Sequence, residues 1–224
     1  MKIIILNGSP RKNGSTAKIL HKLEENLQTL DDVEVEFINL ADKNIQQCHG
    51  CCSCYKTGKC FINDDADTLS QAIAASDGLI IGSPTYASNV SGILKQFIDR
   101  GHFVIEQLLH DKYAISIATG ENYGSTDTQK IISKLLKYSG AKLSGKITYN
   151  LPFNSNPNEV QKLTSMCEKI SLRLYKNIKF KRKYIIQELF HKIIFNAGIK
   201  PFVIKKGENY QAVLSRYKQI EIIN

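Results

Sequence analysis

The sequence predicts an α/β fold in which helices cover both faces of a doubly wound, five-stranded parallel sheet. Short apolar runs alternate with segments whose apolar residues recur at helical spacing, and this order of strand and helix repeats five times. The first run, residues 3–6, is continuously apolar, as expected of a strand buried on both faces. Right-handed crossovers between successive strands then favour the strand order 2-1-3-4-5.

The segment after the first strand is expected to form a loop and then a helix. Gly8, Pro10 and Gly14 cannot continue a strand, and Ser15 or Thr16 is a good N-cap for the amphipathic segment that follows. The N-terminus of this helix would present free N–H groups and the positive end of its dipole to the loop. These groups predict a phosphate site, whose side chains are Ser9, Arg11, Ser15 and Thr16.

The spacing of the loop indicates which phosphate it suits. A Walker loop has four residues between its glycines and then a Lys before Ser or Thr, whereas five residues separate Gly8 from Gly14 and Ser15 follows directly. A nucleoside triphosphate is therefore not expected. The loop also lacks the three-glycine dinucleotide fingerprint, so a single terminal phosphate fits best. An ordinary strand-to-helix turn with capping residues is the alternative.

The other elements follow from the same patterns. One strand alternates in polarity, which suits a position at or near a sheet edge, and Asp64 and Asp65 favour the start of a helix. Gly140 is expected to end the helix before the last strand. The predicted strands are residues 3–6, 33–38, 78–82, 113–118 and 142–148. The predicted helices after the first are residues 64–75, 93–100, 126–138 and 157–176.

The loops after the third and fourth strands are expected to open at the same edge of the sheet as the first loop. Open parallel sheets bind ligands at the carboxyl ends of their strands. Tyr86 offers a flat ring, and backbone groups around it could bond the polar edge of a planar heterocycle. Simple turns are the alternative. The candidate residues are Pro84, Thr85, Tyr86, Ser88 and Asn89 in one loop and Thr119, Gly120, Glu121, Asn122 and Tyr123 in the other.

Most of the cysteines lie in one short segment, residues 48–60, together with two glycines. Four of them are separated by two, two and five residues, a compact spacing that can place four thiolates around a [4Fe–4S] cluster. Four thiolates also suit zinc, and a loop without a metal is the third possibility. The candidate ligands are Cys48, Cys51, Cys54 and Cys60, with Cys52 as the spare cysteine.

The basic residues are concentrated late in the chain. The net charge is +9, and residues 176–206 contain nine Lys or Arg and one acidic residue, Glu188. A net positive charge of this size raises the possibility of binding to nucleic acid or to an anionic membrane surface, but a solvated face of helices is the favoured interpretation. Weak binding of these basic residues to an acidic partner is a further possibility.

The predicted domain organisation is an α/β domain, residues 1–176, and a basic, mainly helical C-terminal extension, residues 177–224. Apolar residues at helical spacing predict a helix at 184–195, which residues 196–198 should stop, and a second short helix at 209–217. The apolar run after Met1 is too short for a signal peptide, and no later run approaches a membrane span. We therefore expect a cytoplasmic protein whose cysteines are thiols or metal ligands.

Three segments, taken together and in this order, carry a family resemblance. They are Gly8-Ser9-Pro10-Arg11 with Gly14-Ser15-Thr16, the cysteine segment, and Ser83-Pro84-Thr85-Tyr86 with Lys95-x-Phe97-Ile98-Asp99-Arg100. Over about residues 2–150 the chain resembles the NADPH-dependent FMN reductases of the flavodoxin-like superfamily, and most closely their iron–sulfur flavoproteins. The likeness implies a flavodoxin-like fold and FMN. Its phosphate would lie on Ser9, Arg11, Gly14, Ser15 and Thr16, with the isoalloxazine against residues 84–89 and 119–123.

The resemblance also implies a function. It indicates an oxidoreductase that takes a hydride from NAD(P)H and passes electrons to a small-molecule or protein acceptor, with the chemistry carried by FMN rather than by a catalytic side chain. A redox partner beside the flavin favours [4Fe–4S] over zinc, although similar loops in such reductases also occur without a cluster. Homodimers or homotetramers are common in this family. The alternatives are an electron carrier without NAD(P)H activity and a non-redox binding module that has kept the fold.

Overall fold

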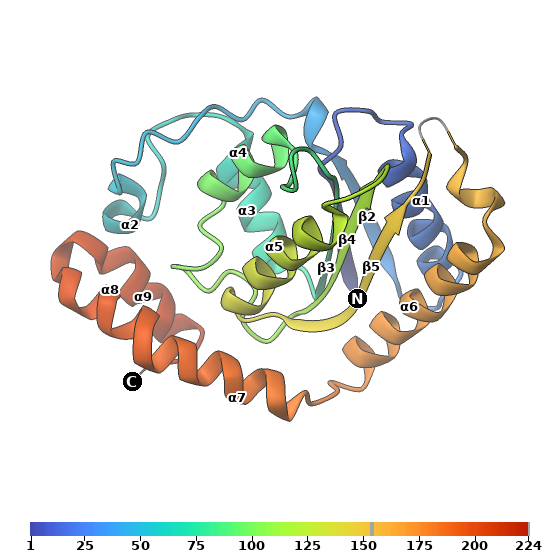
Figure 1. Ribbon diagram of the computed structural model, residues 1–224. Helices are drawn as coiled ribbons and strands as arrows, with labels where there is room; N and C mark the ends of the chain where they lie inside the picture. The colour runs from blue at the N-terminus through green and yellow to red at the C-terminus, as the bar shows by residue number, and fades with distance from the viewer. Residues whose placement is uncertain (153–154, 224) are drawn as a thin grey trace.

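The predicted sheet and its strand order are confirmed. The structure is a computed structural model that describes residues 1–152 and 155–223, and in this part of the chain five parallel strands lie in the order β2-β1-β3-β4-β5 (Figure 1). Each strand extends the predicted run by a residue or two at one end or both, apart from β2, which is shifted by one residue. The strands are β1 Lys2–Asn7, β2 Glu34–Asn39, β3 Gly78–Pro84, β4 Tyr113–Gly120 and β5 Lys142–Asn150.

Helices cover both faces of the sheet because alternate residues of each inner strand point to opposite faces. Ile3 and Ile5 of β1 pack under one helical layer, and Ile4 and Leu6 pack under the other, all four fully buried. The first layer is α1 Ser15–Gln28 and α6 Gln161–Lys179; the second is α3 Asp65–Ala75, α4 Gly92–Arg100 and α5 Ser125–Tyr138. The short helices are η1 Leu40–Asp42, α2 Ser53–Thr57 and η2 Pro157–Glu159.

The helix starts show where capping was predicted correctly and where it was not. The carboxylate of Asp64 accepts the Ala66 N–H and caps α3, as predicted. The prediction that Ser15 or Thr16 caps α1 is wrong, because Gly14 occupies the N-cap position and no side chain bonds the free N–H groups. The Thr16 hydroxyl is instead engaged with Thr119 Oγ1, at 2.6 Å.

The C-terminal extension is helical; its first helix passes the amino end of β5, and its last helices lie beside α2 (Figure 1). The prediction that residues 196–198 stop its first helix is wrong. A π turn at these residues carries the helix onward, and the wider turn accommodates Pro201, which has no N–H for the helical ladder. The elements are α7 Ile185–Ile194, the π turn η3 Phe195–Ile199, α8 Lys200–Lys206, η4 Gly207–Tyr210 and α9 Gln211–Gln219.

The division at residues 176 and 177 stays a prediction, and α6 crosses that position. The extension has its own apolar cluster, in which Phe195 packs against Tyr217 with ring centroids 5.2 Å apart. Tyr55 of the cysteine segment joins this cluster through Tyr210, at 4.8 Å. None of the helices in the described part of the chain is both long enough and apolar enough to cross a bilayer.

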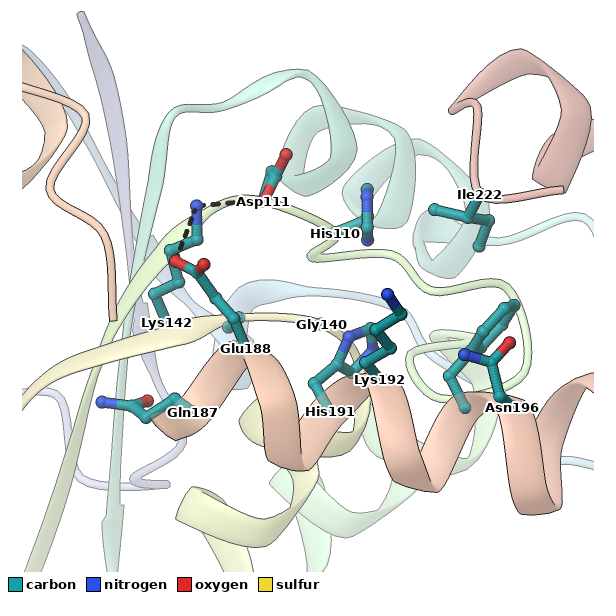
Figure 2. A pocket seen from close by; sticks show the side chains of 12 residues that line it. His110, Asp111, Gly140, Lys142, Gln187, Glu188, His191, Lys192, Asn196 and Ile222 are labelled. Carbon is teal, nitrogen blue, oxygen red and sulfur yellow. Dashed lines mark ion pairs between the residues drawn. The ribbon is translucent and has the colours of Figure 1, made fainter. Parts of the chain in front are cut away.

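Helix α7 docks on the sheet through polar side chains. The Gln187 amide accepts the Leu143 N–H at 2.8 Å and donates to the Leu143 carbonyl at 3.1 Å, so it pairs with the free edge of β5. His191 bonds Gln107 at 2.6 Å. A cavity of about 320 Å³ remains between α7 and the core, lined by His110, Asp111, Lys142, Glu188 and His191 among others (Figure 2).

Acidification is expected to weaken this docking. Burial lowers the pKa of both His110 and His191 below 6.5. Neighbouring positive charges lower each pKa further, whereas the carboxylate of Asp111 raises it. The unfolded chain therefore holds more protons on these two rings near and below pH 6.5, and their contribution to stability falls as the pH drops from about 7.5 to about 5.5. The other charges facing the two rings are Lys112, Lys142, Glu188, Lys192 and Arg216.

Urea unfolding at several pH values measures this loss. His191→Gln keeps a donor for Gln107 but removes one titrating ring, so the variant should lose less stability on acidification than the parent chain. Identical pH slopes for the two proteins would contradict the prediction.

Candidate functional site

A cleft of about 520 Å³ lies at the carboxyl edge of the sheet, opposite the edge covered by α7. It is bordered by the segments that follow β1, β3, β4 and β5. Of the residues predicted from the sequence, the cleft is lined by Arg11, Ser15, Thr16, Pro84, Thr85, Tyr86, Thr119, Gly120, Glu121, Asn122 and Tyr123. The structure does not place Ser9, Gly14, Ser88 or Asn89 on its wall.

Ser9 and Gly14 shape the first loop from beneath its surface. The Ser9 side chain is buried, and its hydroxyl accepts the Arg11 N–H at 3.1 Å. The Gly14 N–H donates to the Arg11 carbonyl at 3.1 Å. A Cβ at residue 14 would lie 3.2 Å from Arg11 Cβ, so glycine leaves room for this arginine beside the helix start. Both residues therefore act on the cleft through Arg11.

The N-terminus of α1 is open toward the cleft. The first bond of the helix runs from the Lys18 N–H to the Gly14 carbonyl, so the N–H groups of residues 15–17 have no partner within the helix. No side chain caps them, and the first turn has no acidic residue. Ser15 and Thr16 line the cleft at this point, and Arg11 is exposed next to them. Free N–H groups, the helix dipole and a guanidinium together favour a bound anion.

The second loop ends in a tight turn that holds Tyr86 at the cleft. Tyr86 and Asn89 exchange two backbone hydrogen bonds of 3.0 Å, and Ala87 and Ser88 between them have φ values of 48° and 57°. This is the pattern of a type I′ turn. Its tip packs on Gly124, where a Cβ would lie 2.6 Å from Ser88 Oγ. Ser88 and Asn89 therefore form the support of the loop, while the Tyr86 ring stays 45% exposed.

The third loop is fixed by Asn150 at the end of β5. The Asn150 amide donates to the Asn122 carbonyl at 2.5 Å and accepts the Ser125 hydroxyl at 2.5 Å. Leu151 and Pro152, which follow directly, also line the cleft and were missed from the sequence. Their position could have been predicted, because they come directly after the fifth strand, and the carboxyl end of that strand must lie at the same edge of the sheet.

One polar atom at the cleft lacks a partner. Thr85 Oγ1 is buried and has no hydrogen bond to any described residue, although the Thr85 N–H donates to the Thr119 carbonyl at 2.7 Å. Buried hydroxyls are normally bonded, so an unpartnered one in the wall of a cleft indicates a ligand group that completes it. Thr85 and the third candidate loop line the same cleft.

The cysteine segment encloses a second, much smaller cavity. Cys48, Cys51, Cys52, Cys54 and Cys60 all line it, and its volume is about 80 Å³. Among the described residues no three His, Cys, Asp or Glu side chains come together closely enough to hold a metal ion. The backbone winds through left-handed conformations at residues 50, 52 and 58, with φ between 57° and 79°. The predicted ligands thus share one cavity but are not gathered at metal-binding distances.

A buried ion pair anchors this segment. The Arg100 guanidinium donates to both oxygens of Asp64 at 2.8 and 2.9 Å and to the Gln46 carbonyl at 2.9 Å, and the two side chains are 1% and 0% exposed. Burial acts to raise the pKa of the Asp64 carboxyl, but the hydrogen bonds from Arg100, Gln46 and Ala66 outweigh it and hold the pKa below its ordinary value. In the sequence, Arg100 is recognisable only as the last residue of the third motif.

A second cation lies beside the thiols. Burial lowers the pKa of His102, but hydrogen bonds with Cys54 and Glu106 outweigh this effect and raise it to about 10. His102 and Arg100 both line the small cavity, so positive charge faces the five cysteines.

Comparisons with known proteins identify relatives of this chain. The family model described as NADPH-dependent FMN reductase matches residues 1–155. An iron–sulfur flavoprotein of Clostridioides difficile is 36% identical over 226 residues, covering 100% of both chains. A solved NADH:FMN oxidoreductase in its apo form superimposes with a TM-score of 0.58 at 18% identity, over 82% of this chain and 90% of the other. A flavodoxin from the Archaea gives 0.55 at 13% identity, over 80% and 99%. The two solved structures confirm the flavodoxin-like fold.

Proposed function

The chain belongs to the NADPH-dependent FMN reductase family, and we propose that it binds FMN in the cleft at the carboxyl edge and accepts a hydride there from NAD(P)H. Family membership makes it an FMN-dependent oxidoreductase. The observation that carries the proposed site is the uncapped N-terminus of α1, which opens beside Arg11 onto a cleft large enough for a flavin.

In the proposed complex the phosphate lies at the start of α1. The N–H groups of residues 15–17 and the Arg11 guanidinium would bind it, with Ser9 and Gly14 keeping Arg11 in place. The ring system would lie against residues 84–86 and 119–123, with the turn at Ser88 and Asn89 as support. These assignments keep every residue predicted for the cofactor but give four of them an indirect role.

FMN, when bound, supplies the redox chemistry, and the residues of this chain supply its position and electrostatic surroundings. In the proposed complex, the Thr85 hydroxyl would find its missing hydrogen-bond partner at a polar edge of the ring. Tyr86 and Tyr123 are 45% and 75% exposed at the mouth of the cleft, where a second planar group can approach. No side chain of the cleft is proposed as an acid or base.

Anaerobic purification followed by a visible spectrum and titration with NADH and NADPH tests this function. Bound flavin that is bleached by either nucleotide supports the reductase. Bound flavin that neither nucleotide reduces would favour the electron carrier without NAD(P)H activity. A protein that neither holds nor takes up FMN would favour the binding module. The acceptor, the cytoplasmic location and the homodimer or homotetramer stay predictions.

Replacing Thr85 with valine is expected to raise the dissociation constant for FMN by about 5- to 10-fold, because one hydrogen bond is lost. The same change should leave the free protein as stable or slightly more stable, since it removes an unpartnered buried hydroxyl. Thr128→Val is the matched control, because Thr128 Oγ1 is also buried without a partner but lies on α5, outside the cleft. Fluorescence titration and urea unfolding measure the two effects. Equal FMN affinity of Thr85→Val and Thr128→Val would contradict the pose.

For the cysteine segment we propose a [4Fe–4S] cluster on Cys48, Cys51, Cys54 and Cys60. Three observations support this proposal. The cysteines line one cavity, the cations Arg100 and His102 face them, and a relative that aligns over its full length is named an iron–sulfur flavoprotein. The thiols would have to move together to hold it. Iron, acid-labile sulfide and zinc analysis of anaerobically purified protein separates the cluster from zinc and from a metal-free loop.

A further inference from the structure

Helix α7 presents an apolar stripe to solvent. Ile186 is 84% exposed, Ile185 74%, Leu189 58% and Ile193 58%, and Phe190 lies beside them at 44%. These five residues, which we call the α7 stripe, share one face of the helix because they are spaced one, three or four apart. The opposite face carries Gln187, Glu188 and His191, which point toward the core (Figure 2).

Basic side chains flank the α7 stripe at both ends. Lys181, Arg182 and Lys183 precede the helix, and Lys205 and Lys206 lie in α8; all five are exposed. None of the five forms an ion pair with another described residue. Glu188 is the sole acidic residue in the sequence from 176 to 206, and its carboxylate faces Lys142 at 3.7 Å. The exposed side of α7 is therefore apolar in the middle and positive around it.

We propose that the α7 stripe and its basic flanks form a docking face for an anionic lipid surface. An amphipathic helix with cations beside its apolar face can bury that face at the boundary of headgroups and acyl chains while the cations bind lipid phosphates. A second copy of the chain suits this face less well than a lipid surface does. A symmetric contact would place each stripe on the other and bring two sets of unpaired cations together. Nucleic acid would satisfy the cations but leave the apolar stripe in water.

The position of α7 in the fold is compatible with this docking. It runs along the amino edge of the sheet, whereas the flavin cleft opens at the carboxyl edge (Figure 1). A lipid surface bound by α7 would leave the cleft accessible to nucleotide and acceptor. The docking of α7 depends neither on FMN binding nor on the cluster. If the lipid proposal fails, the other two proposals are unaffected, and the reverse also holds.

Cosedimentation of the full chain with vesicles tests the proposal. Vesicles of phosphatidylcholine containing phosphatidylglycerol should bind the protein, whereas vesicles of phosphatidylcholine alone should bind it about 10-fold more weakly or not at all, and salt should reduce the difference. Ile186→Gln with Ile193→Gln should lower the affinity for anionic vesicles at least about 10-fold, with Leu172→Gln on α6 as the matched control. Lys183→Gln with Lys205→Gln should also weaken binding, with Lys43→Gln and Lys162→Gln as controls for charge.

The stripe variants are checked by urea unfolding, which should be unchanged because the replaced side chains are exposed. Equal binding to both vesicle types would overturn the proposal, as would anionic binding that the isoleucine changes leave intact. Light scattering distinguishes the other occupant. If the isoleucine changes convert a larger oligomer into a smaller one and no vesicle binding is seen, a second copy covers the stripe and the proposal fails.

Discussion

Replacing Arg11 with alanine is expected to raise the dissociation constant for FMN by about 10- to 100-fold and to leave the affinity for riboflavin unchanged. Arg11 lines the cleft beside the open N-terminus of α1, where a phosphate would meet its guanidinium. Hydrogen bonds to a charged group contribute about 1.5–3 kcal/mol each, more than bonds between neutral groups. Riboflavin has the same ring without the phosphate, so it does not gain from this contact.

Flavin fluorescence titration with both ligands measures the effect. Lys12→Ala is the matched control, because Lys12 is the adjacent cation but pairs with Asp42 and does not line the cleft. An equal loss of affinity for FMN and riboflavin in Arg11→Ala would mean that Arg11 supports the ring or the loop rather than the phosphate. A loss in Lys12→Ala of the same size would point to the general positive field instead.

The sheet and the edge that carries the cleft were predictable because they depend on local patterns with a single topological solution. Continuous apolar runs predict buried parallel strands, and right-handed crossovers then fix the edge at which the loops meet. The position of Tyr86 and Thr119 across one cleft follows directly. The same reasoning also applies to Leu151 and Pro152, which were missed only because the loop after the last strand was not considered.

The roles of individual loop residues were not predictable, because they depend on which partner a side chain finds. Threonine commonly caps helices, yet the hydroxyl of Thr16 forms a hydrogen bond with Thr119, which lies on a strand about a hundred residues away. Ser88 packs on Gly124, because the turn adopts two left-handed residues. Spacing along the sequence gives no information on contacts of this length.

The extension shows a further limit. Asn196 and Gly198 are residue types that commonly end helices, but the segment continues as a π turn whose first residue, Phe195, is buried against Tyr217. Tertiary packing here outweighs local preference. The ion pair of Arg100 and Asp64 was hidden for the same reason, since its members are 36 residues apart and join two different elements.

Arg100→Ala is expected to lower the free energy of unfolding by about 3–5 kcal/mol, the largest effect on stability that we predict. The substitution leaves the Asp64 carboxylate buried without its cation, although the N–H groups of Gln46 and Ala66 still donate to it. Lys95→Ala is the matched control on the same helix. It breaks an ion pair with Asp99 in which both side chains are about half exposed, and it should cost less than about 1 kcal/mol.

The pH dependence of the loss identifies its cause. Without Arg100, the largest effect that lowers the pKa of Asp64 is gone while burial still raises it, so the folded variant takes up a proton at a higher pH than the parent protein does. The difference in unfolding free energy between parent and Arg100→Ala should therefore shrink as the pH falls from about 7 to about 4. Asp64→Asn combined with Arg100→Met should recover part of the stability, because no unpaired charge remains. A loss that is independent of pH and is not relieved in the double variant would assign the effect to lost packing of the arginine, and the ion pair would then not be what holds the cysteine segment in place.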